Sequence, residues 1–64
     1  MRTLDYILEK RAITIVQLAE LSSLDPGRVE AITVGRWTAS PHERQQIVAA
    51  LDLTVEDIIW GHYM

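Results

Sequence analysis

The hydrophobic positions of this 64-residue chain follow a helical period rather than the alternation of strands. Leu4, Ile7 and Leu8 recur at spacings of three and four residues, which places them on one face of a helix. Arg11 continues this face through its aliphatic stem. The pattern predicts a first helix over residues 3–11, with Thr3 able to cap it.

A polar residue with capping chemistry precedes the next apolar segment. Thr14 and Gln17 have the spacing of a capping box, in which each side chain bonds the backbone N–H of the other residue. The sequence therefore predicts a second helix over Thr14–Ser22. The β-branched run over residues 13–16 also suits a strand, but a lone strand without a partner is not stable, so we favour the helix.

Only a short turn separates this helix from the next one. Leu24 is the residue of the turn that we expect to enter the core. Asp25 suits an N-cap and is followed by a proline, which is tolerated at the first helical position, so a third helix is predicted over Pro26–Val34. Gly35 ends it as a left-handed cap. Two helices joined by a tight turn over residues 14–35 form a helix-turn-helix, whose second helix can enter a DNA major groove.

Two further helices are predicted after a short loop. Ser40 begins the fourth, with Glu43 completing a second capping box, and Asp52 closes it. Thr54 then has the position of a cap for a fifth short helix over Val55–Trp60. The fold class that follows is all-α: a compact bundle of five short helices containing a helix-turn-helix.

Composition limits the chemistry. The length makes one domain over residues 1–64. There is no cysteine, and the two histidines are far apart in sequence, so we expect no disulfide, no metal site and no cofactor. No apolar run is long enough for a membrane span, and the start of the chain lacks the pattern of a signal peptide, so we expect a cytoplasmic protein without a membrane partner.

The net charge of −3 is unevenly placed. Residues 1–51 carry equal numbers of basic and acidic side chains, and the excess acid lies at Asp52, Glu56 and Asp57. Dedicated DNA-binding domains usually show a basic stripe. Any positive patch on this chain must therefore be local.

Residues 13–60 resemble the lambda-repressor-like helix-turn-helix domain in its short Cro/C1-type, XRE-like form. The resemblance is a pattern of core and cap positions that runs without a gap from Thr14 to Leu53. It implies the five-helix fold and a DNA-binding transcriptional regulator. The residues that carry it are Ile13, Thr14, Leu18, Ala19, Leu24, Val29, Ile32, Gly35, Ile47, Leu51, Leu53, Thr54, Val55, Glu56, Asp57, Ile58 and Ile59.

The departures from this family concern its outer surface and one buried pair. Ile15 stands where the family usually has a glutamine that contacts the DNA backbone, and Val16 where it often has an acid. Ser23 replaces the turn glycine. Leu8 and Thr33 stand where the family often pairs an arginine with a glutamate. Replacing both partners of such a pair together can leave stability unchanged, whereas replacing only one would leave a buried charge without a partner.

The candidate DNA contacts lie on the third helix and in the loop after it. The fork of Arg28 can bond guanine O6 and N7, and Ala31 can touch a thymine methyl group. Glu30 would repel phosphates unless it accepts from a cytosine amine. Side chains that simply face water would be the alternative interpretation. The residues expected to contact phosphate are Thr33, Arg36, Thr38, Ser40 and Arg44.

The end of the chain is unusually apolar. In a monomer, several of its hydrophobic side chains would be exposed, and exposed apolar patches mark partner sites. We therefore predict a homodimer, with the alternative that the tail folds back to complete a small core. The residues predicted at the dimer or partner interface are Trp37, Ile59, Trp60 and Tyr63.

Two functions follow from these features. The first is a small transcriptional regulator that binds double-stranded DNA as a dimer and reads the major groove with its third helix. The second keeps the same fold as a protein-interaction module, with Ile15, Val16, Leu21 and Trp37 on the partner face. An enzyme is not expected, because no nucleophile–base pair is apparent and a small bundle leaves little room for a pocket or a small-molecule substrate.

Overall fold

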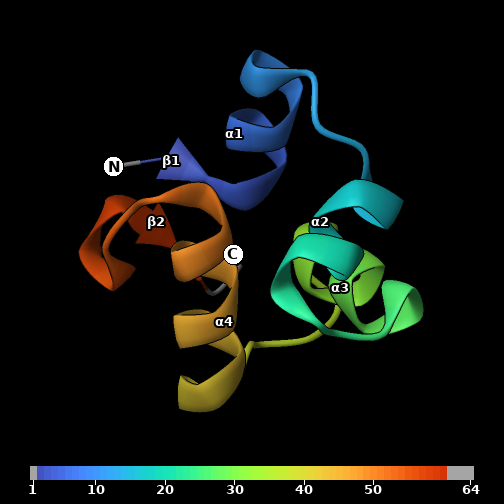
Figure 1. The fold of residues 1–64 in the computed structure, drawn as a ribbon. Coiled ribbons are helices and arrows are strands. Elements are labelled where there is room, and N and C mark those ends of the chain that lie inside the picture. Colours follow the sequence, from blue (N-terminus) through green and yellow to red (C-terminus); the bar gives the residue numbers. More distant parts are fainter. Residues whose placement is uncertain (1, 61–64) are drawn as a thin grey trace.

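The computed structural model describes residues 2–60 of the chain, and the fold over these residues is mostly helical (Figure 1). Four α-helices account for most of it, and a short parallel strand pair joins the two ends of the described chain. The elements, in order, are β1 (Arg2–Thr3), α1 (Leu4–Arg11), α2 (Ile15–Ser22), α3 (Pro26–Thr33), α4 (Pro41–Leu51), a 3-10 turn η1 (Val55–Asp57) and β2 (Ile58–Ile59).

The predicted helix starts are confirmed by their caps. In α2, the Thr14 hydroxyl accepts from the Gln17 N–H at 3.0 Å, and the Gln17 side chain accepts from the Thr14 N–H at 2.8 Å. In α4, Ser40 and Glu43 make the same reciprocal pair. Each box satisfies two N–H groups that a helix start would otherwise leave unbonded.

Residues in the left-handed conformation end three of the four helices. Ala12, Ser23 and Asp52 have φ values of 55°, 62° and 59° and cap α1, α2 and α4. Ser23 thus adopts, without glycine, the conformation that the turn requires. Gly35, with a φ of 84°, lies one residue beyond the C-cap of α3, as predicted.

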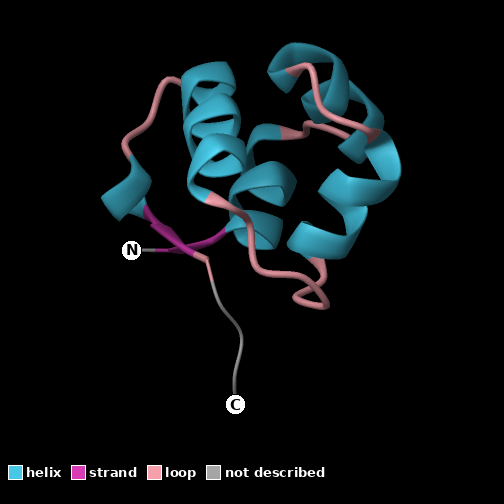
Figure 2. Cartoon of the chain, turned by 90° about the horizontal axis from the view of Figure 1, so that it is seen from below, coloured by secondary structure: helices cyan, strands magenta, loops and turns pink. Residues whose placement is uncertain are grey.

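The prediction of a fifth helix over Val55–Trp60 is wrong. Only the single turn η1 forms, and the chain then extends into β2, which pairs in parallel with β1. Arg2 lies opposite Ile58, and Thr3 lies opposite Ile59. Two consecutive β-branched residues suit an extended conformation once a partner strand is available. Figure 2 shows the two strands side by side at one end of the molecule.

The core lies between the helices, with α2 packed against both α3 and α4. Leu24 is half-buried against this core, as predicted for the turn residue. Leu8 and Thr33 are both buried and uncharged. The other fully or nearly buried side chains of the core include Leu18, Val29, Ile32, Ile47, Leu51 and Ile58.

None of the helices in the described part of the chain has the length and apolar character needed to cross a membrane.

Candidate nucleic-acid interface

The first turn of α3 is fixed by the side chain of Asp25. Its Oδ2 atom accepts from the N–H of Gly27 at 2.9 Å and from the N–H of Arg28 at 3.3 Å. Pro26 occupies the first helical position, where its missing N–H has no consequence. These bonds therefore fix where α3 begins, and they hold the backbone of Arg28 in place within the first turn.

Arg28 is the centre of a three-residue cluster drawn from three parts of the chain. Its Nε and Nη2 atoms both donate to the carboxylate of Glu43 in α4, the latter at 3.2 Å from Oε1. Its guanidinium carbon lies 4.2 Å from the ring centroid of Trp37, in the loop between α3 and α4. The ion pair limits the motion of the guanidinium in its plane, and the ring covers one of its faces.

Glu43 is held from the other side by the start of its own helix. Its Oε1 atom also accepts from the backbone N–H of Ser40 at 2.8 Å. The hydrogen bond from Arg28 lowers the pKa of Glu43 below its ordinary value of 4.5, and the bond from Ser40 adds to this against the opposing effect of burial. Glu43 is therefore a carboxylate at neutral pH, and Arg28 retains its partner.

Sequence reasoning assigned Glu43 to the capping box and missed its second role. Arg28 and Glu43 are fifteen residues apart and lie on different helices. A local spacing rule has no access to such a contact.

The loop and the start of α4 present fewer free groups than the sequence predicts. Arg36 and Thr38 are exposed. Ser40 is half-buried, and its hydroxyl is occupied by the cap. Arg44 is also half-buried; its Nε atom donates to the carbonyl of Ala39 at 2.9 Å, and its guanidinium carbon lies 5.6 Å from the ring centroid of Trp60.

Thr33 does not face outward, contrary to our expectation for a phosphate contact. Its side chain is buried, and its hydroxyl donates to the carbonyl of Val29 at 2.7 Å. This bond to the preceding turn satisfies the hydroxyl inside the core. Ala31, the expected contact to a thymine methyl group, is half-buried.

The residues predicted at a dimer interface divide into three groups. Trp37 and Ile59 are 50% and 39% exposed. Trp60 is only 8% exposed, and its Nε1 atom donates to the carbonyl of Val55 at 2.9 Å, so the prediction of an exposed Trp60 is wrong. The tail folds back at this point, which was the alternative. Tyr63 lies outside the described residues.

Other apolar side chains remain on the surface of α2 and at the end of α3. Val16 and Leu21 are 57% and 61% exposed, and Val34 is 55% exposed. Ile15 differs from them, because it is half-buried against the core. The partner face that the sequence indicated therefore loses Ile15 and retains Val16, Leu21 and Trp37.

Comparisons with protein-family models, with curated proteins and with solved structures find no match for this chain. No group of His, Cys, Asp and Glu side chains within residues 2–60 has the arrangement of a metal site. What the surface binds is therefore inferred from its own geometry and charge.

Proposed function

We propose that this chain is a small DNA-binding regulator that places α3 in the major groove and reads guanine with Arg28. The observation that carries the proposal is the fixed position of the Arg28 guanidinium, held at its edge by Glu43 and on its face by Trp37. Two eight-residue helices joined by residues 23–25 support it further, because this is the element order of a helix-turn-helix.

The chemistry of the guanidinium explains why an ion pair is compatible with base reading. Arg28 uses the edge formed by Nε and Nη2 for Glu43. The opposite end, with both N–H groups of Nη1 and the outer N–H of Nη2, has no part in this pair. That end has the fork geometry that matches O6 and N7 of guanine. Glu43 thus orients the arginine before DNA arrives, which lowers the entropy lost on binding.

Phosphate contacts are expected from the loop that follows α3. Arg36 and Thr38 are exposed there, and Arg44 keeps N–H groups beyond the one that bonds Ala39. Glu30 is also exposed on α3 and repels phosphate. The net positive charge of this surface is therefore small, and we expect DNA binding to be weak and best measured at low ionic strength.

The test is binding to duplex DNA fragments of mixed sequence over a series of salt concentrations. With Arg36 and Arg44 as the cationic phosphate contacts, the logarithm of the affinity should fall with the logarithm of salt concentration with a slope of roughly −2. Arg36→Gln should reduce the slope by about 1. Glu9→Gln, on α1, serves as a charge-changing control that leaves this surface intact. Absence of binding at low salt, or a flat salt dependence, would contradict the proposal.

A protein-interaction module is the second candidate, favoured by the exposed apolar side chains Val16, Leu21 and Trp37. Light scattering over a range of concentrations distinguishes the two functions when combined with the DNA titration. A dimer that binds DNA supports a regulator with paired half-sites. Self-association without DNA binding, abolished by Leu21→Gln, supports the interaction module instead.

A further inference from the structure

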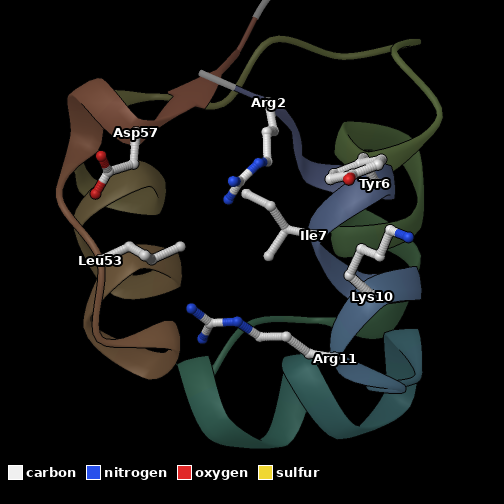
Figure 3. Close-up of a pocket in the computed structure, with 7 residues that line it drawn as sticks. All are labelled: Arg2, Tyr6, Ile7, Lys10, Arg11, Leu53 and Asp57. Atoms are coloured by element: carbon white, nitrogen blue, oxygen red, sulfur yellow. The ribbon is translucent and has the colours of Figure 1, made fainter.

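A cavity of about 480 Å³ lies between α1, the strand β1 and the turn η1, on residues that take no part in the Arg28 cluster (Figure 3). This volume is within the usual range for small-molecule sites. It is larger than we expected for a chain of this length. Arg2 reaches into it from β1 and Arg11 from the end of α1, with Ile7 between them.

The charge of the lining is opposite to that of the whole chain. Arg2, Lys10 and Arg11 line the cavity, so it gathers three of the six basic side chains, together with Asp57 as one of the nine acidic ones. No carboxylate within residues 2–60 forms an ion pair with any of these three cations. A local excess of positive charge in a concave site concentrates anions.

Two kinds of contact hold the cations at the cavity. The Nη1 atom of Arg11 donates to the carbonyl of Leu51, at the end of α4, over 2.6 Å. The charged groups of Arg2 and Lys10 lie 5.8 Å and 5.5 Å from the ring centroid of Tyr6, within the distance of a cation–π contact. Arg11 therefore spans the cavity from α1 to α4, and its other N–H groups remain for a ligand.

The rest of the lining is apolar. Ile7 is buried, Leu53 is half-buried, and the ring of Tyr6 completes this part of the wall. The lining therefore combines four charged side chains with three apolar or aromatic ones, so it offers an organic anion both a charge partner and an apolar surface.

We propose that this cavity binds a small organic anion that has one anionic group and an apolar body. The anionic group pairs with Arg2 and Arg11, and the apolar body packs on Ile7 and Leu53. Asp57, whose carboxylate accepts from the N–H and the hydroxyl of Thr54 at 3.0 Å, disfavours a ligand with several negative charges. The site does not depend on DNA binding, because it shares no residue with α3 or the start of α4.

Occupation of the cavity would join elements that are distant in the sequence. Arg2 belongs to β1, Asp57 precedes β2, and Arg11 contacts the end of α4. A ligand that bridges these residues binds the folded chain only and therefore stabilises it against unfolding.

The test uses benzoate as the probe, with benzamide as its neutral match and inorganic phosphate as an anion without an apolar body. Amide chemical shifts of the 64-residue chain are followed by NMR during each titration. Benzoate should bind saturably with a dissociation constant of about 1 mM, as a molecule of this size allows, and should move the amides of Ile7, Arg11 and Leu53. Benzamide should not.

Variants then assign the site. The change Arg2→Gln removes one of the two cations that pair with the anionic group, and it should weaken benzoate binding about tenfold while the fold, judged from the remaining shifts, is retained. Arg36→Gln removes a cation outside the cavity and should have no effect. Equal binding of benzamide, equal binding of phosphate, or unchanged affinity in the Arg2 variant would overturn the proposal. Displacement of benzoate by a DNA duplex would also overturn it, because the cavity would then bind DNA phosphate.

Discussion

Arg28 and Glu43 connect the first turn of α3 to the first turn of α4 through a two-point ion pair. The same carboxylate accepts from the N–H of Ser40 and so completes the cap of α4. One side chain thus fixes the start of a helix and the direction of an arginine on its neighbour. Any change at Glu43 is expected to affect both.

Glu43→Gln should reduce the free energy of unfolding by about 1 kcal/mol, since Gln retains an acceptor for Ser40 but loses the charge that Arg28 pairs with. Because the folded state lowers the pKa of Glu43, this contribution is fully present above pH 4.5 and is lost as the pH falls through the lower, folded-state value. Chemical denaturation of both proteins between pH 7 and pH 3 measures it.

The expected pattern is a stability difference that narrows as acid is added. Other carboxylates, such as Asp57, whose pKa is lowered by its hydrogen bonds to Thr54, titrate in both proteins and cancel in the comparison. A difference that stays constant down to pH 3 would show that the charge of Glu43 does not stabilise the fold.

Trp37→Leu should weaken DNA binding several-fold with little loss of stability. The ring is half-exposed, so its removal deletes a cation–π contact worth about 0.5–1 kcal/mol and frees the Arg28 guanidinium on one face. Leu21→Gln, at another exposed apolar position, is the matched control and should leave DNA affinity unchanged. Fluorescence anisotropy of a labelled duplex distinguishes the two, and equal effects would contradict the role of Trp37.

Trp60→Phe should lower the free energy of unfolding by about 1–2 kcal/mol, because it removes a buried hydrogen-bond donor from the carbonyl of Val55 while keeping an aromatic ring. The oligomeric state should not change, since Trp60 is buried in the single chain. Thermal unfolding and light scattering on the same samples check both statements. A shift from dimer to monomer would instead place Trp60 in an interface.

Thr33→Val and Thr38→Val form a matched pair that separates a core hydroxyl from a surface one. Thr33→Val should leave DNA affinity unchanged and cost less than about 1.5 kcal/mol in stability, because its hydroxyl bonds only within α3. Thr38→Val should leave stability unchanged and weaken DNA binding slightly. Reversed effects in anisotropy and denaturation would show that the two side chains have been assigned to the wrong environments.

The sequence predicts those parts of the fold that depend on neighbouring residues. Thr14 with Gln17, and Ser40 with Glu43, bond over three residues, so a spacing rule finds them. The end of the fourth helix at Asp52 and the turn residue Leu24 follow from the same local logic.

The errors concern contacts between residues that are far apart in the chain. The residues after Thr54 have the capping pattern of a helix start, but β1 supplies a partner strand more than fifty residues away. The burial of Trp60 and the pairing of Arg28 with Glu43 depend in the same way on how the helices pack. Thr33 was expected to contact phosphate, but its hydroxyl can be buried because it bonds its own helix.

The pairing of β1 with β2 sets an order for the assembly of this fold. During synthesis Arg2 and Thr3 are made before their partners Ile58 and Ile59, which follow only after the four helices α1–α4. Closing a loop of that length is slow relative to the formation of a helical turn. β1 therefore has no partner strand until β2 has been made, and a nascent chain that carries only β1 and α1–α4 still lacks this parallel pair.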